Sequence, residues 1–360
     1  MHKQSQTQVL FVYLGNRLPD YAVSSIEMAA KYSNQDVVLL ANESALKNTR
    51  ITNCLVVSVE SFYSPVNFEV ARRGLNSDAK FRSALWAKSL ERFFVLEQYM
   101  IHYGLDEIFH AELDQFLFDT SSLVGALKKI DYRGLFAPCH SSKAVVASLF
   151  YCNSLEAFTE FLGFAASGVR YSSEMELLSR WASISEGKFL ELPTVHTYLH
   201  LISDATIVGS DLLTSKELNG VTDAAEFGQW FGGIDPRNVP IFESPMNKFV
   251  GPPGNSNLSS NELSSCKLSF DSEKNRLMLE IPNLSNTQIF NLHIHSKIHS
   301  TKFLDVTYLQ KVISSVNSEE VMRFRGTRKL QIQDFFTSYS VIILARIKKV
   351  LASILRSVLR

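Results

Sequence analysis

The most informative stretch of this chain reads Glu107-Ile108-Phe109-His110-Ala111-Glu112-Leu113-Asp114-Gln115. Its apolar start predicts a buried β-strand, and the strand ends in two carboxylates, Glu112 and Asp114. Carboxylates at the end of a buried strand are costly unless a cation offsets their charge. Oxygen ligands suit Mg²⁺ or Mn²⁺, so this acid-x-acid pair predicts a metal site. The plainer alternative is a solvated turn that carries two ordinary acids.

The composition is that of a globular protein with a sizeable core, because 46% of the 360 residues are hydrophobic and 20% are charged. Lys plus Arg and Asp plus Glu each number 36, so no global basic field favours nucleic acid. The 4 cysteines lie far apart and predict neither a zinc site nor a disulfide framework. We expect a cytoplasmic protein, since the N-terminus is polar and no apolar stretch approaches the roughly 20 residues of a membrane span.

The N-terminal part alternates between strand and helix patterns. Apolar runs at residues 9–14, 36–40 and 54–57 predict strands, and a helix follows the first of them from Asp20. This alternation predicts an α/β fold whose parallel strands are covered by helices. Ligands of such sheets bind at the carboxyl ends of the strands, and no glycine-rich dinucleotide or P-loop motif is present. We therefore expect the nucleotide to contact the end of the first strand, namely Leu14, Gly15 and Asn16.

A long amphipathic helix is predicted over residues 81–103, because apolar residues recur at helical spacing until Gly104. Within it, the guanidinium of Arg92 is expected either to clamp a diphosphate or to brace the metal-binding carboxylates. Further helices are predicted over residues 148–164 and 173–184, and strands at 135–138 and 277–281.

The stretch from Thr222 to Asn238 predicts a helix with an N-cap at Thr222 or Asp223. Asp223 is either a plain cap or a carboxylate at the helix mouth that faces a sugar and its acceptor. Asp223 and Glu226 are accordingly our candidates for a catalytic base. The candidate acceptor-binding residues are Gln229, Trp230 and Asp235. Residues 246–265 are predicted to form a loop, long enough to act as a lid.

The sequence Phe290-Asn291-Leu292-His293-Ile294-His295-Ser296-Lys297 predicts a strand with both histidines on one face. These two histidines either contact a metal or a phosphate, or they are ordinary packed or exposed side chains. A manganese ion held by two acids accepts an imidazole, so His293 and His295 are candidate metal ligands. Lys297 is the candidate contact for a phosphate.

The C-terminal segment carries an apolar stripe at helical spacing from Ile343 to Val358, with arginines and lysines opposite it. A basic amphipathic helix at the end of a chain suits an anionic membrane surface. The alternative is a helix that docks on the protein core or on a partner.

Taken together, these motifs resemble those of a bacterial family of GT-A-fold glycosyltransferases. The stretches that carry the resemblance are residues 92–97, 108–114, 227–238 and 291–297, and it spans most of Leu10 to Phe303. It implies a Rossmann-type mixed sheet flanked by helices, a nucleotide-diphosphate sugar as donor, and Mn²⁺ or Mg²⁺ bound by the acid-x-acid motif and a late histidine. The family motif usually has Asp at both acidic positions, whereas the first is Glu112 here.

The resemblance predicts a glycosyltransferase domain over residues 1–328, and the basic helical tail at 329–360, which the charge and apolar pattern predict, is not part of the resemblance. Its nucleotide-sugar half is residues 1–120, and its acceptor half is 121–328. The expected enzyme is a metal-dependent transferase of the hexosyltransferase type that acts on a glycan or lipid-linked saccharide in surface polysaccharide synthesis. It is expected at the inner membrane face through its tail. Two alternatives use the same residues: a metal-dependent phosphoester hydrolase, and a non-catalytic sugar- or membrane-binding module.

Overall fold

A computed structural model describes residues 7–47, 51–76, 85–232, 258, 260–295, 297 and 301–316. The chain divides into two units, Met1–Asn317 and Ser318–Arg360, and every described residue belongs to the first. The predicted tail at 329–360, Asp235 and most of the predicted loop at 246–265 lie outside the described residues. Among the helices that are described, none combines the length and the apolar character needed to cross a lipid bilayer.

The main element of the first unit is a mixed sheet with the strand order β10-β9-β6-β8-β4-β1-β2-β3, with β7 paired to β6. Strand β8 runs antiparallel to both of its neighbours, β4 and β6, whereas the other pairs along this order are parallel. The strands are β1 (Val9–Tyr13), β2 (Val37–Ala41), β3 (Leu55–Ser58), β4 (Ile108–Ala111), β6 (Leu135–Ser141), β7 (Ala144–Val145), β8 (Leu149–Cys152), β9 (Phe189–Leu192) and β10 (Asp211–Leu212). The prediction of a mixed α/β sheet flanked by helices is confirmed.

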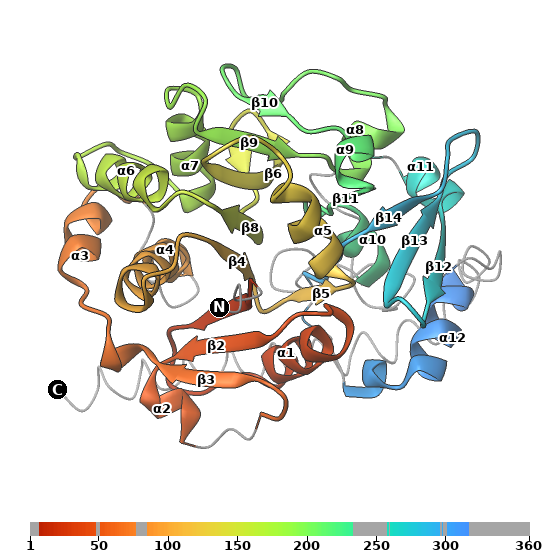
Figure 1. Cartoon of the computed structure of the whole chain (residues 1–360), viewed down its shortest axis with the longest axis horizontal. Helices are drawn as coiled ribbons and strands as arrows, with labels where there is room; N and C mark the ends of the chain where they lie inside the picture. Colours follow the sequence, from red (N-terminus) through yellow and green to blue (C-terminus); the bar gives the residue numbers. More distant parts are fainter. Residues whose placement is uncertain are drawn as a thin grey trace, which may run out of the picture. The chain divides into compact units, whose positions relative to one another are not determined.

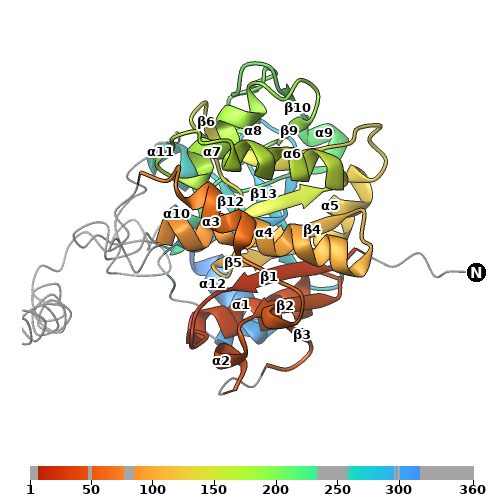
Figure 2. The same ribbon diagram turned by 90° about the vertical axis from the view of Figure 1, so that its left-hand side faces the viewer.

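Helices cover both faces of this sheet, as Figures 1 and 2 show. Strand side chains alternate between the two faces, so that Leu10 joins one core and Phe11 the other. The first core lies under α3 (Val66–Arg72), α4 (Leu85–Tyr103), α6 (Leu155–Ala166) and α7 (Glu174–Ala182). The second lies under α1 (Asp20–Tyr32) and α5 (Thr120–Leu127).

The helix predicted over residues 148–164 is wrong in its first part, because residues 149–152 form β8. All of these side chains are buried, and Phe150 packs on one face of the sheet while Tyr151 packs on the other. A short apolar run that is buried on both faces has no period that separates strand from helix. The helix begins only after Ser154, whose side chain accepts a hydrogen bond from the main-chain N–H of Ala157.

A second, four-stranded sheet has the order β11-β14-β13-β12, and a separate pair joins β5 to β15. These strands are β5 (Gln115–Leu117), β11 (Gly220–Val221), β12 (Lys267–Asp271), β13 (Arg276–Glu280), β14 (Thr287–Ile289) and β15 (Asn291–His293). The remaining elements are α2 (Glu43–Leu46), α8 (Val195–Leu199), α9 (Ser215–Leu218), α10 (Phe227–Gly232), α11 (Ser260–Ser265), α12 (Val306–Val316) and the short 3₁₀ turns η1 (Val59–Ser61) and η3 (Thr301–Leu304). Helix α11 corrects the end of the predicted loop at 246–265.

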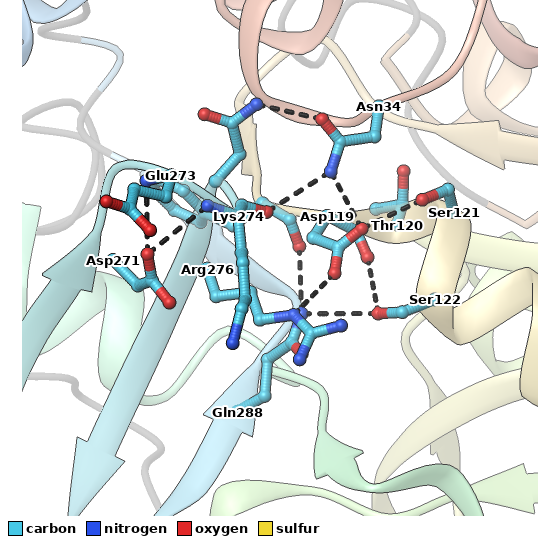
Figure 3. Close-up of polar contacts among 12 residues, drawn as sticks. Asn34, Asp119, Thr120, Ser121, Ser122, Asp271, Glu273, Lys274, Arg276 and Gln288 are labelled. Atoms are coloured by element: carbon cyan, nitrogen blue, oxygen red, sulfur yellow. Dashed lines mark hydrogen bonds and ion pairs between the residues drawn. The ribbon is translucent and has the colours of Figure 1, made fainter.

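A buried carboxylate, Asp119, ties the second sheet to the N-terminal half (Figure 3). It accepts hydrogen bonds from Arg276 Nε on β13 at 2.7 Å, from Asn34 Nδ2 at 2.9 Å and from Ser121 Oγ at 2.8 Å. Burial alone would raise the pKa of Asp119, but these donors outweigh burial and lower it, so the carboxylate is stabilised in its charged form. The contact fixes β13, and with it the neighbouring β14, which leads directly into β15.

Candidate metal centre and its pocket

The pairing of β5 with β15 brings the two distant motifs of the sequence together. Strand β4 ends at Ala111, the two acids occupy the turn that follows, and β5 begins at Gln115. Gln115 pairs with His293 across the two strands, and the main-chain N–H of Ile294 donates to Asp114 O at 2.8 Å. His293 is therefore held beside the acidic turn by main-chain hydrogen bonds.

Glu112, Asp114 and His293 each offer one ligand atom, and these three atoms all lie within 4.8 Å of one another. His293 Nε2 is 3.3 Å from Asp114 Oδ1 and 3.8 Å from Glu112 Oε2. Two carboxylates and one imidazole are a donor set that suits Mn²⁺ or Mg²⁺ with further positions left for other ligands. The residues present thus fit the cation that the sequence predicts.

The electrostatics of this cluster favour a charged Asp114. Burial alone would raise the pKa of Asp114, but Lys297, at 2.7 Å, and His293 hold it well below its usual range. Conversely, burial alone would lower the pKa of His293, and the Asp114 carboxylate raises it. The two neighbouring acids favour a positive charge at the His293 ring. A bound metal ion would supply that charge in place of a proton.

The predicted strand over residues 290–297 is shorter than expected, because β15 ends at His293. The chain then turns, with the main-chain N–H of His295 donating to His293 O at 3.0 Å and Lys297 adopting a positive φ of 60°. The turn sends the Lys297 ammonium back to Asp114. Among the described residues, His293 belongs to the three-ligand cluster and His295 does not, although the two rings lie 5.7 Å apart.

A pocket of about 310 Å³ lies beside the cluster, and most of the predicted cofactor-binding residues line it. They are Leu14, Gly15, Arg92, Glu112 and Lys297, whereas Asn16, which is exposed, is not among the lining residues. Lys297 Nζ also lies 5.5 Å from the centre of the Tyr21 ring, a cation–π contact. The pocket has the size of a small-molecule site.

Arg92 lies on α4 with its side chain buried and paired to two acids. It forms an ion pair with Glu112, and its Nη2 is 3.6 Å from Glu174 Oε1. Of the two predictions for Arg92, the bracing of a metal-binding carboxylate matches this geometry. Burial raises the pKa of Glu174 to about 7, against the opposing effect of Arg92. The sequence around Glu174 gives no signal of a site, because an acid directly after the N-cap Ser173 is an ordinary feature of a helix start.

Asp223, predicted as a cap or a catalytic base, has every carboxylate oxygen engaged by main-chain amides. Oδ1 accepts hydrogen bonds from Glu226 and Phe227 at 2.8 and 2.9 Å. Oδ2 accepts from Gly228 and His293 at 2.7 and 2.9 Å. Helix α10 begins at Phe227, later than the N-cap predicted at Thr222 or Asp223. Asp223 nevertheless accepts from the first main-chain amides of this helix and at the same time holds the main chain of the candidate metal ligand His293. This geometry favours the cap, and a role as base stays a prediction.

The other residues predicted as a base or as acceptor contacts are described but do not line the pocket, apart from Asp235, which lies outside the described residues. Glu226 is buried, with its Oε1 3.3 Å from His140 Nδ1. Trp230 packs its ring against Phe227 at a centroid distance of 5.3 Å, at the edge of a third apolar core that α10 forms with strands of the second sheet. Neither these two nor Gln229 is among the described residues that line the pocket. Their roles in catalysis and in acceptor binding stay predictions.

Comparison with known protein families and with curated proteins finds no match. Among solved structures, mouse xyloside xylosyltransferase 1 is similar with a TM-score of 0.39 and 9% identity, over 52% of this chain and 85% of that one. The galactosyltransferase LgtC is similar with a TM-score of 0.35 and 12% identity, over 55% of this chain and 79% of that one. A cytidylyltransferase from Leptospira borgpetersenii is similar with a TM-score of 0.34 and 14% identity, over 53% of this chain and 77% of that one. Likeness at this level says nothing about the activity of this chain.

Proposed function

We propose that this protein is a metal-dependent glycosyltransferase that uses a nucleotide-diphosphate sugar. The observation that carries the proposal is the set of ligand atoms from Glu112, Asp114 and His293 within 4.8 Å of one another, beside a pocket that Lys297 also lines. A cation site next to a lysine suits a diphosphate, which carries negative charge on both phosphates. The resemblance of the same stretches to glycosyltransferase motifs supports the transfer of a sugar.

In this proposal, Glu112, Asp114 and His293 hold Mn²⁺ or Mg²⁺. When bound, the cation supplies positive charge that stabilises the leaving nucleoside diphosphate. Lys297 adds a second positive charge beside Asp114, and Arg92 fixes the Glu112 carboxylate through its ion pair. Leu14 and Gly15, which follow the end of β1, line the pocket where the nucleotide is expected.

The acceptor that we propose is a glycan or lipid-linked saccharide in surface polysaccharide synthesis. The support is the basic amphipathic pattern of residues 329–360, which suits the anionic inner face of a membrane. Flotation with anionic vesicles tests this part separately, by comparing the full chain with a chain truncated after Asp334. Flotation of the full chain alone is the expected result, and equal flotation of both would remove the tail from the proposal.

Isothermal titration with UDP and Mn²⁺ tests the site itself. The wild-type protein is expected to bind UDP in a manner that depends on the metal, whereas Asp114→Ala should lose this binding and remain folded. Asp271→Ala is a matched control, because Asp271 is a partly exposed acid whose hydrogen bonds to main-chain amides lie within its own turn. Undiminished binding by Asp114→Ala would contradict the proposal. Release of inorganic phosphate without an acceptor would instead favour the hydrolase alternative.

A further inference from the structure

Apart from His293 and His295, four residues that line one pocket each have a buried polar atom without a hydrogen-bond partner among the described protein groups. These atoms are Arg92 Nε, His110 Nε2, Ser148 Oγ and Glu174 Oε2, and all four residues line the pocket beside the metal cluster. None of these residues is more than 8% exposed. A buried polar group without a partner is unfavourable, so a cluster of such groups around one pocket calls for a ligand that satisfies them.

The chemistry of these atoms is rich in acceptors. His110 Nδ1 lies 2.8 Å from the main-chain oxygen of Leu10, which only accepts, so Nδ1 carries the proton and Nε2 is left as an acceptor. His110 is also fully buried, and burial favours the neutral form of an imidazole. Glu174 Oε2 is also an acceptor, Ser148 Oγ both donates and accepts, and Arg92 Nε donates. Hydroxyl groups, which donate as well as accept, match this set.

Charge divides the pocket into two sides. On the Asp114 side stands Lys297, a group that suits a diphosphate, and His293 lies between the two acids, 3.3 Å from Asp114 and 3.8 Å from Glu112. On the Glu112 side, the single positive charge of Arg92 already pairs with both Glu112 and Glu174. Lys88 also lines the pocket, but it is exposed, so among the buried described residues on this side Arg92 is the one cation, and two acids already share it. An additional carboxylate here would lie near Glu174.

We propose that the Glu112 side of the pocket binds the sugar of the donor, and that Glu174 is the residue that selects an uncharged sugar and excludes a uronate. This inference rests on the proposed function and adds to it the class of sugar. Glu174 Oε2 and His110 Nε2 accept hydrogen bonds from sugar hydroxyls, and Ser148 Oγ completes the set. A uronate carboxylate, which only accepts, would face these acceptors and the Glu174 charge.

The experiment measures affinities by isothermal titration of the full chain with Mn²⁺ at pH 8. UDP, GDP, dTDP and ADP are titrated first, to find the nucleoside diphosphate that binds. The same nucleotide is then compared as its glucose and glucuronate conjugates, which differ only at C6. We expect the glucuronate form to bind about tenfold more weakly, or worse, because like charges repel strongly in a buried site.

Two variants make the test specific. Glu174→Gln should bring the two affinities to within about threefold of each other, since the amide removes the charge and adds a donor. Glu176→Gln, two residues along the same helix and paired with Arg180 away from the pocket, should leave the wild-type ratio unchanged. If Glu174→Gln does not fold, the wild-type protein still offers a refutation, because equal affinities for the two conjugates would overturn the role of Glu174.

The outcomes separate this inference from the proposed function. Metal-dependent binding of a nucleotide with equal affinity for both conjugates would overturn the role of Glu174 and leave the proposed function standing. A ratio that persists unchanged in folded Glu174→Gln would also overturn it. Absence of binding by all four nucleotides in the presence of metal would overturn the proposed function and this inference together.

Discussion

Replacing Asp223 by asparagine tests whether this residue positions His293 or acts in chemistry. The variant keeps an oxygen at the Oδ1 position, where Glu226 and Phe227 donate. Its amide nitrogen takes the place of Oδ2, which accepts from Gly228 and His293. Two buried main-chain N–H groups then face a donor instead of an acceptor. Each lost hydrogen bond costs about 1–3 kcal/mol, so the free energy of unfolding should fall by about 4 kcal/mol.

Urea unfolding in EDTA measures this loss, and titration of the folded variant with Mn²⁺ measures its consequence for the site. Because the freed N–H groups include that of His293, metal affinity should fall together with stability. Asp271→Asn is the control, since Asp271 also accepts from two main-chain amides but in an exposed turn, and it should cost less than about 1 kcal/mol. Wild-type stability and wild-type metal affinity in Asp223→Asn would refute the reasoning.

Two further predictions concern neighbours of the cluster. In Gly228→Ala, the new Cβ would lie within 3 Å of the main-chain nitrogen and oxygen of His293. We therefore expect the free energy of unfolding in urea to fall by about 1–3 kcal/mol and Mn²⁺ binding to weaken. Gly163→Ala, in an open position on α6, is the control and should stabilise the protein by about 1 kcal/mol. For Glu174, burial raises the pKa from 4.5 to about 7, so the folded protein binds more protons than the unfolded chain between these values and loses stability as pH rises. Relative to Glu174→Gln, the wild-type free energy of unfolding in EDTA should fall by about 3 kcal/mol from pH 4 to pH 8, and a difference that stays flat would contradict the assignment.

The individual metal-ligand candidates could be predicted from the sequence, because each lies at or directly after the end of a predicted strand. Glu112 and Asp114 come directly after the apolar run of β4, and His293 closes the alternation of β15. What no local pattern shows is the antiparallel pairing of β5 with β15, which brings Asp114 and His293 together from opposite ends of the domain. That pairing depends on the second sheet, which Asp119 and Arg276 fix to the N-terminal half.

Residues whose signal coincides with an ordinary structural role could not be found in advance. Glu174 follows an N-cap serine, as acids commonly do, and only the folded chain shows that it is buried against Arg92. Ser148 lies just before β8, in a stretch where the prediction of a helix was wrong. Asp223 was recognised both as a cap and as a candidate base, and its four main-chain hydrogen bonds become visible only once His293 lies beside it.

The most direct measurement of the central claim is anomalous diffraction from crystals grown with Mn²⁺ and UDP. The account predicts an anomalous peak at roughly 2.1 Å from oxygen atoms of Glu112 and Asp114 and from an imidazole nitrogen of His293, with the diphosphate on its Lys297 side. A nucleotide bound in this pocket with the manganese peak elsewhere, or with no peak between these three side chains, would contradict it.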